Sequence, residues 1–311
     1  MEDAPRDRCN GIYAVGDAGA VVHHDKSSSC LEVSHPTGSL SQEFSPSPTS
    51  SPSVSEAGSP PNIRLSIVTP TKRRDNSDYI QVLAASIWST VKPTQIDPGP
   101  VKRWTILNSD REITYRSGLD VVVNSYEPKW WGIVDPPDYG DLLDLEVLLN
   151  LTTIETENHP RLVWRARESL DYASALRAAV QAVPNCTHVV IFQDDVVLSV
   201  DWVERVTNYL ALNDGPQLCL IQTWFLEENG KFCGSVGTAF TKEEALELAN
   251  FIWKNYCSYP VDWIVKTRRE SLGRPEPMLT PGIGQHIGLS SSLQGKKQPL
   301  ASNDWAWGET K

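Results

Sequence analysis

A short, wholly apolar run that ends in acidic residues constrains the fold of this chain more than any other feature. Residues 188–199 read His-Val-Val-Ile-Phe-Gln-Asp-Asp-Val-Val-Leu-Ser, with four apolar residues in succession at 189–192. A run this short and this uniformly apolar, rich in β-branched residues, predicts a strand buried on both faces, as in a parallel sheet. The sequence therefore favours an α/β domain in which helices cover the sheet.

Two adjacent carboxylates, Asp194 and Asp195, follow this predicted strand directly. Open α/β sheets bind their ligands at the carboxyl ends of parallel strands. Oxygen ligands in such a place suit Mg²⁺ or Mn²⁺, and these sites usually share the metal with substrate phosphates. The alternative is an ordinary turn, because Asp often ends strands and caps helices.

Composition and charge exclude several classes of protein. The 311 residues allow one large domain or two ordinary ones, and a net charge of -11 argues against a nucleic-acid binder. The six cysteines include no Cys-X-X-Cys pair, which argues against a zinc site, and their even number permits disulfides without requiring them. We expect no transmembrane helix, because no run of 18 apolar residues occurs, and residues 11–22 are too weakly apolar to indicate a signal peptide.

The composition of the chain changes near residue 62. Residues 26–61 consist largely of Ser, Pro, Thr and Gly, as in Ser45-Pro-Ser-Pro-Thr-Ser-Ser-Pro-Ser. Such a segment buries too little apolar surface to offset the entropy lost on ordering. We therefore predict a disordered segment over 1–61 and a globular domain over 62–311.

Within the globular part the pattern alternates between strands and helices. The expected strands are 63–69, 104–108, 121–124 and 189–192, followed by a hairpin of 218–225 with 232–236 around Asn229-Gly230. The first expected helix begins at Asp75 or Ser77 and ends at Pro93. Three further helices are expected over residues 170–183, 203–210 and 241–256. The last of these opens on the capping box Thr241-Lys-Glu-Glu. This order predicts a doubly wound, nucleotide-binding architecture.

Five segments together resemble a known family. They are Thr69-Pro-Thr-Lys-Arg-Arg, Val163-Trp-Arg-Ala-Arg-Glu-Ser-Leu-Asp-Tyr, Phe192-Gln-Asp-Asp-Val, Tyr259-Pro-Val-Asp-Trp and Gly284-Gln-His-Ile-Gly-Leu-Ser-Ser-Ser-Leu-Gln-Gly-Lys. In order and spacing they are similar to the N-acetylglucosaminyltransferase IV family and to the related enzymes that add N-acetylgalactosamine to GPI anchors. The resemblance covers roughly residues 63–296. Its most specific part begins at Gln285.

The resemblance implies a GT-A fold: a mostly parallel sheet flanked by helices, with a late β-hairpin. It also implies an inverting hexosaminyltransferase that uses a UDP-sugar donor, a glycan acceptor on a glycoprotein or GPI anchor, and a divalent metal, Mn²⁺ or alternatively Mg²⁺. The family works in the Golgi or the secretory lumen. Because we see no signal peptide or membrane anchor, a cytoplasmic chain or a truncated gene prediction is the alternative.

The same resemblance assigns roles to the acidic motif. We expect Asp195 and His286 to bind the metal, and Asp194 to reach the donor ribose or a metal-bound water. Gln193 adjoins the donor in this assignment but replaces the Glu that usually opens the family motif. The alternative for His286 is a purely structural role.

Further residues are expected at the donor and acceptor. Asp262 is the candidate general base for the acceptor hydroxyl, with a helix N-cap as the alternative. The remaining candidates are assigned to the donor, with surface ion pairs or a solvated basic turn as the alternative: Thr69, Thr71, Lys72, Arg73, Arg165 and Asp171, with Arg167 beside them.

Two other classes of function use some of the same residues. A degenerate transferase fold that acts as a binding or scaffold protein would explain Gln193. A nucleotidyltransferase or phosphohydrolase would also use paired carboxylates, but it does not explain the segment that begins at Gln285.

Overall fold

The computed structural model describes residues 13–15, 21–23, 62–73, 79–91, 99–111, 113–124, 130–144, 148, 159–221, 223–224 and 231–288. The chain divides into two compact units, of which the smaller comprises residues 11–61. In that unit β1 (Tyr13–Val15) pairs antiparallel with β2 (Val21–His23). The rest of the segment predicted to be disordered lies outside the described residues, so that assignment stays a prediction.

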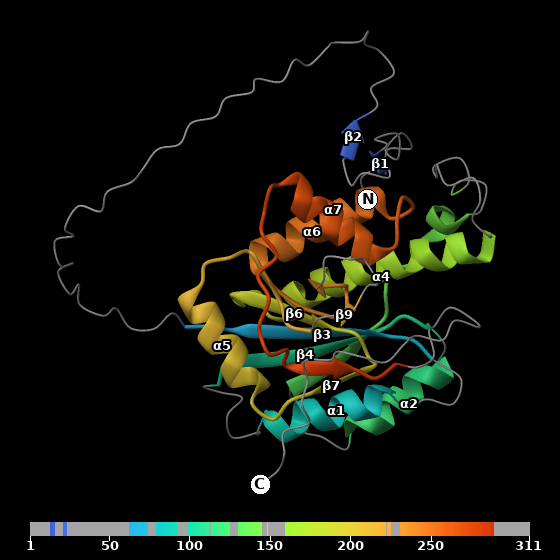
Figure 1. The fold of residues 1–311 in the computed structure, drawn as a ribbon. Helices are drawn as coiled ribbons and strands as arrows, with labels where there is room; N and C mark the ends of the chain where they lie inside the picture. The colour runs from blue at the N-terminus through green and yellow to red at the C-terminus, as the bar shows by residue number, and fades with distance from the viewer. Residues whose placement is uncertain are drawn as a thin grey trace, which may run out of the picture. The chain divides into compact units, whose positions relative to one another are not determined.

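The larger unit is built on a six-stranded sheet with the order β5-β4-β3-β6-β11-β8. Its strands are β3 (Leu65–Thr71), β4 (Val101–Asn108), β5 (Trp131–Val134), β6 (His188–Phe192), β8 (Gln217–Cys219) and β11 (Gly237–Thr241). The four strands from β5 to β6 are mutually parallel, and β11 runs antiparallel to both of its neighbours. The predicted mostly parallel α/β sheet is therefore confirmed (Figure 1).

Helices cover both faces of this sheet (Figure 1). The helices on one face are α1 (Tyr79–Thr90), α2 (Ile113–Asn124) and α5 (Trp202–Leu212), and those on the other are α4 (His159–Ala182), α6 (Lys242–Asn255) and α7 (Val261–Ser271). Side chains alternate along a strand, so Ile67 of β3 packs in the core under α1 while Val68 packs in the core under α4 and α6. Burial on both faces explains why the strands read as continuous apolar runs.

The strand expected at 121–124 is wrong, because these residues form the last turn of α2. Leu119 is buried, and Val122 packs against the same core three residues later, which is helical spacing. A run of only three valines does not distinguish a strand from a helix by its pattern. Packing against the sheet decides in favour of the helix here.

Other local predictions are confirmed. Thr241 caps α6, its hydroxyl accepting a hydrogen bond from the Glu244 N–H at 3.2 Å. The late hairpin consists of β9 (Thr223–Trp224) and β10 (Lys231–Phe232), while its Asn229-Gly230 turn lies outside the described residues. The residues expected to cap α1 also lie outside them.

Two short strands and the 3-10 helix η3 (Gly140–Leu143) complete the unit. β7 (Val196–Leu198) pairs antiparallel with β12 (Gly284–His286) in a ladder separate from the main sheet. A disulfide joins Cys219 to Cys233. None of the helices in the described part of the chain has the length and apolar character needed to span a membrane.

Candidate functional site

The four parallel strands end at the same edge of the sheet. The register pairs Thr71 of β3 with Asn108 of β4, and Leu107 of β4 with Val134 at the end of β5. β6 ends beside them at Phe192, directly before the acidic motif. This edge is where an open α/β sheet binds its ligand.

Asp195 and His286 come together at this edge. His286 is the last residue of β12, and the β12–β7 register places it opposite Val196, the residue after Asp195. The Nε2 atom of His286 lies 3.0 Å from Oδ2 of Asp195, and both side chains are largely shielded from solvent. The structure therefore brings together the two residues that were expected to bind a metal.

The backbone after β12 also closes on Asp195. The Ile287 N–H donates to the Asp195 carbonyl oxygen at 2.8 Å. At Gly288 a Cβ atom would lie 2.0 Å from Oδ2 of Asp195, so no side chain fits there without displacing the carboxylate. Gly288 in the Gln285-His-Ile-Gly segment is thus required for steric reasons, because it lets the chain pass directly over the carboxylate.

These two side chains suit a divalent cation. Nε2 of His286 is buried and makes no hydrogen bond despite its approach to Asp195. Imidazole nitrogen and carboxylate oxygen are both ligands that Mn²⁺ accepts. Among the described residues no group of three or more His, Cys, Asp or Glu gathers as a metal site. A cation bound by Asp195 and His286 would therefore complete its coordination with water and ligand oxygens, as Mg²⁺ commonly does beside phosphates.

Asp194 faces the end of β3. Its Oδ2 accepts a hydrogen bond from the Thr71 hydroxyl at 2.9 Å and lies 3.4 Å from the Lys72 backbone N–H. Three predicted site residues from two segments therefore meet. The carboxylate of Asp194 joins the carboxyl ends of β3 and β6, and its neighbour Asp195 faces His286.

The other residues after β3 take different positions. Thr69 is fully buried, and its hydroxyl accepts from the Trp104 indole N–H at 3.1 Å. Arg73 is exposed, and its backbone N–H donates to Asp110, which follows β4, at 3.0 Å. Thr69 is thus engaged in the sheet, whereas Lys72 and Arg73 lie at its carboxyl edge.

Gln193 lies between the strand and the carboxylates. Its backbone N–H donates to the Val236 carbonyl at 2.9 Å, and its side-chain amide donates to the Ser235 hydroxyl at 2.8 Å. The side chain that replaces the usual Glu thus contacts the segment between β10 and β11.

Asp171 belongs to a second polar cluster at the same edge. Its carboxylate accepts a hydrogen bond from the Tyr139 hydroxyl at 2.6 Å, and Ser174 lies 3.2 Å from that hydroxyl. Burial raises the pKa of Asp171 to about 6, while the Tyr139 hydrogen bond and the positive charges of Arg111 and Arg167 oppose the rise. Burial and the Asp171 charge also raise the pKa of Tyr139.

The sequence did not indicate Tyr139 or Arg111. Arg111 adopts a positive φ of 63°, and its guanidinium lies 4.5 Å from the centre of the Tyr139 ring. It also donates to the Pro137 carbonyl at 2.7 Å, so it joins the chain after β4 to the chain after β5. Neither segment has helical or strand periodicity, and the strained backbone of Arg111 leaves no mark in the sequence.

Arg165 and Asp262 lie on helices. Arg165 is buried on α4 and donates to the Cys257 carbonyl at 3.2 Å. Asp262 is the second residue of α7, whose N-cap is Pro260, so the expected alternative of an N-cap is not what the structure has. One carboxylate oxygen of Asp262 accepts from the Trp263 N–H at 2.9 Å. The base role of Asp262 stays a prediction.

The chain is similar in sequence to curated transferases. No protein-family model matches it. Alpha-1,3-mannosyl-glycoprotein 4-beta-N-acetylglucosaminyltransferase A of Bos taurus is 24% identical over 191 residues, which cover 56% of this chain and 32% of that protein. Form C of Macaca fascicularis is 24% identical over 171 residues, covering 55% and 33%. The expected resemblance to this family is confirmed, although the chain spans only about a third of the length of these relatives.

The chain is also similar to solved structures of other proteins. A mannosyltransferase from Pyrobaculum calidifontis, in complex with GDP-Man and Mn²⁺, has a TM-score of 0.44 and 14% identity. The match covers 70% of this chain and 55% of that chain.

Proposed function

We propose that this chain is an inverting glycosyltransferase that moves an N-acetylhexosamine from a UDP-sugar to a hydroxyl group of a glycan. The observation that carries the proposal is the approach of His286 to Asp195 within 3.0 Å at the carboxyl edge of the sheet. The sequence similarity to N-acetylglucosaminyltransferases supports the same reaction class.

In the proposed reaction Asp195 and His286 hold a divalent cation, Mn²⁺ or Mg²⁺. When bound, the cation neutralises the charge that develops on the diphosphate leaving group. Asp194, fixed by Thr71, supports the neighbouring Asp195 and approaches the donor ribose. Lys72 and Arg73 are assigned to the diphosphate, since cationic side chains bind phosphate oxygens strongly.

Asp262 is the proposed general base. It takes the proton of the acceptor hydroxyl while that oxygen bonds to the anomeric carbon of the donor sugar. The bond between this carbon and the diphosphate oxygen breaks on the opposite face, so the configuration inverts and UDP leaves. A base that removes a proton in the transition state contributes about 10²–10⁴-fold to the rate.

The acceptor and the compartment are also proposals. The named activity of the relatives points to a mannose-containing glycan on a glycoprotein as the first acceptor to test, with a GPI glycan as the second. A buried disulfide between Cys219 and Cys233 favours an oxidising compartment such as the secretory lumen.

The donor test measures binding by thermal shift, with hydrolysis or transfer as the second readout. UDP-GlcNAc and UDP-GalNAc should raise the melting temperature only when Mn²⁺ or Mg²⁺ is present. A ligand at a hundred times its Kd adds about 2.7 kcal/mol of stability, which is readily detected. Asp195→Ala should remove the metal-dependent shift, and Asp214→Ala, at an exposed position before β8, is the matched control.

Two outcomes would contradict the proposal. The proposal fails if no UDP-sugar stabilises the protein in the presence of either metal. Metal-dependent donor binding without hydrolysis or transfer to any glycan would instead favour the binding or scaffold protein. The contact of Gln193 with Ser235 gives that alternative its structural basis. Gln193 is the residue that departs from the family motif, and it lies beside the Asp195–His286 pair.

A further inference from the structure

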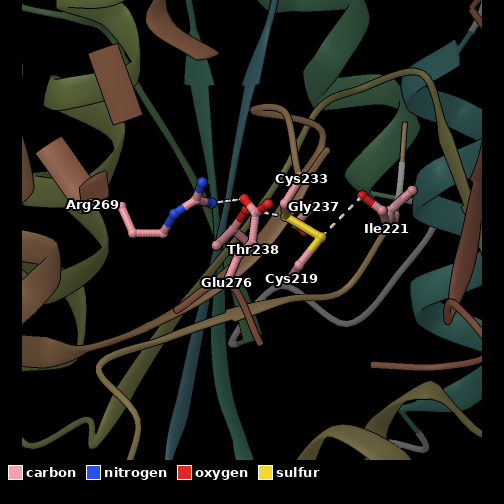
Figure 2. Close-up of a disulfide and its surroundings, with 7 residues drawn as sticks. All are labelled: Cys219, Ile221, Cys233, Gly237, Thr238, Arg269 and Glu276. Carbon is pink, nitrogen blue, oxygen red and sulfur yellow. Dashed lines mark hydrogen bonds and ion pairs between the residues drawn. A yellow bond between two sulfur atoms is a disulfide. The ribbon is translucent and has the colours of Figure 1, made fainter. Parts of the chain in front are cut away.

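The Cys219–Cys233 disulfide closes the base of the β9–β10 hairpin. The bond joins the last residue of β8 to the residue after β10, and both cysteines are buried. Figure 2 shows it between Ile221 and Thr238. Its sulfur atoms lie 3.5 Å from the Ile221 carbonyl and 3.5 Å from the Thr238 hydroxyl. Sulfur in a disulfide has no proton to donate, so the Thr238 hydroxyl is the donor in the second contact.

On the Cys219 side, the disulfide adjoins the segment that leads to His286. The Cys219 backbone donates to the Pro277 carbonyl at 2.9 Å and accepts from the Leu279 N–H at 2.9 Å. One residue further on, the Leu220 carbonyl accepts from Ile283 at 3.1 Å. Residues 277–283 are thus hydrogen-bonded to 219–220, and β12 begins at the next residue.

An ion pair fixes the start of this segment. Arg269 of α7 pairs with Glu276, which Figure 2 shows beside the disulfide. Both side chains are largely buried, so the pair ties the segment to α7. The segment therefore reaches β12 from a point held by both the helix and Cys219.

On the Cys233 side, the disulfide adjoins residues 234–236, which are hydrogen-bonded to the start of the acidic motif. Gln193 makes two hydrogen bonds to this segment, one to Ser235 and one to Val236. Gln193 immediately precedes Asp194 and Asp195. The covalent bond thus joins the two pieces of chain that place the carboxylate and the imidazole.

The space around Ile221 links the two sides directly. Cβ atoms added at Gly237 and at Gly284 would lie 2.8 Å and 3.0 Å from its Cδ1 atom. Ile221 therefore fills the gap between β11 and β12, and both glycines leave room for it. A shift of residues 219–221 would be transmitted to β12 through these contacts.

From this arrangement we propose that the Cys219–Cys233 disulfide is a positioning element of the Asp195–His286 pair. The bond holds residues 219–221 against 233–237, and so fixes β12 relative to the acidic motif. Without it, the distance between the carboxylate and the imidazole varies, and the pair binds a divalent cation less tightly. The consequence for cation binding rests on the proposed function, whereas the effect on β12 does not.

The test compares the oxidised wild-type protein with the double variant Cys219→Ala/Cys233→Ala. Free Mn²⁺, measured by electron paramagnetic resonance, reports the Kd for the metal. Hydrogen exchange of peptides covering residues 279–288, in metal-free protein, reports the order of β12. We expect a Kd at least tenfold weaker and exchange at least tenfold faster in the variant.

A matched control separates positioning from general stability. Cys186→Ala truncates another buried cysteine, which lies in the core under α4 and is not in a disulfide. It should lower the melting temperature while leaving the Mn²⁺ affinity and the exchange of residues 279–288 unchanged. If the double variant does not fold, the folded wild-type protein is reduced with a phosphine, which breaks the sulfur–sulfur bond to give two thiols and becomes a phosphine oxide by taking oxygen from water.

The possible results are distinguishable. Unchanged Mn²⁺ affinity and unchanged exchange in the protein without the disulfide would overturn the inference and leave the proposed function intact. Failure of the oxidised wild-type protein to bind Mn²⁺ would overturn the proposed metal site and, with it, the inference about cation affinity.

Discussion

The proposed general-base role of Asp262 can be tested directly by substitution. It lies in the first turn of α7, where the helix dipole stabilises a negative charge whether or not the residue takes part in chemistry. A carboxylate that serves only the helix and one that removes a proton therefore look alike in a structure. Substitution by Asn separates the two roles, because the amide keeps the size and the acceptor oxygen but does not take a proton.

We expect Asp262→Asn to reduce transfer by about 10²-fold or more, the usual effect of losing a general base. Donor binding and the melting temperature should change little. Initial rates with a glycan acceptor, together with thermal shift by UDP-sugar, measure both. Asp201→Asn, at the start of α5, is the matched control and should keep full activity. Full activity of Asp262→Asn would assign the base to another residue.

The raised pKa of Asp171 should make the stability of the folded protein depend on pH. Because burial raises its pKa from 3.8 to about 6 in the folded protein, the folded state binds the proton more tightly than the unfolded state. Its contribution to stability is therefore greatest below about pH 4 and is lost as the pH rises through about 6. The shift corresponds to about 3 kcal/mol at neutral pH.

Asp171→Asn should remove this dependence. Relative to wild type, the variant should gain stability as the pH rises from 4 to 6. The gain should be of the same order of magnitude as that shift, reduced because the variant loses the charged acceptor of the Tyr139 hydrogen bond. Urea unfolding at pH 4, 5, 6 and 7 measures the difference. A difference that does not change across this range would show that Asp171 is ionised at its ordinary pKa.

At the scale of elements, the segment that follows β12 forms part of the site through its backbone. Gly288→Ala would place a methyl group 2.0 Å from the Asp195 carboxylate, so either the carboxylate or the backbone has to move. We expect Mn²⁺ and donor binding to weaken at least tenfold, measured by titration.

Gly118→Ala is the control for that substitution. A Cβ at Gly118 in α2 would have no atom within 4 Å, so the change should stabilise the helix by about 0.5–1 kcal/mol and leave binding unaltered. Equal metal affinity in the two variants would show that Gly288 does not constrain Asp195.

Elements differ in how well the sequence predicts them. The strand at 188–192 and the capped helix after Thr241 have local patterns, and the structure confirms both. The end of α2 reads as a strand because its short run of valines fits either state, and only packing distinguishes them. The approach of His286 to Asp195 has no local signal at all. It followed from the resemblance, since sequence spacing does not report which distant segments meet.

At the scale of the whole molecule, residues 62–311 should fold without residues 1–61. The smaller compact unit, residues 11–61, ends at this point, and the described core contains only residues after 61. A chain that begins at Asn62 should therefore melt at the same temperature and with the same cooperativity as the full chain. Differential scanning calorimetry of the two proteins is the measurement. A large loss of melting temperature would show that the N-terminal segment stabilises the domain.

The separate β7–β12 ladder has a consequence for the order of assembly. β7 follows the acidic motif directly, whereas β12 is one of the last described elements, so the main sheet can form before the partner of β7 has been synthesised. Closing so long a loop is slow, and contacts of this kind form late in folding. A nascent chain halted before Gly284 would carry the carboxylates without the imidazole. Cation binding would therefore report that synthesis has passed His286 and that the last ladder has closed.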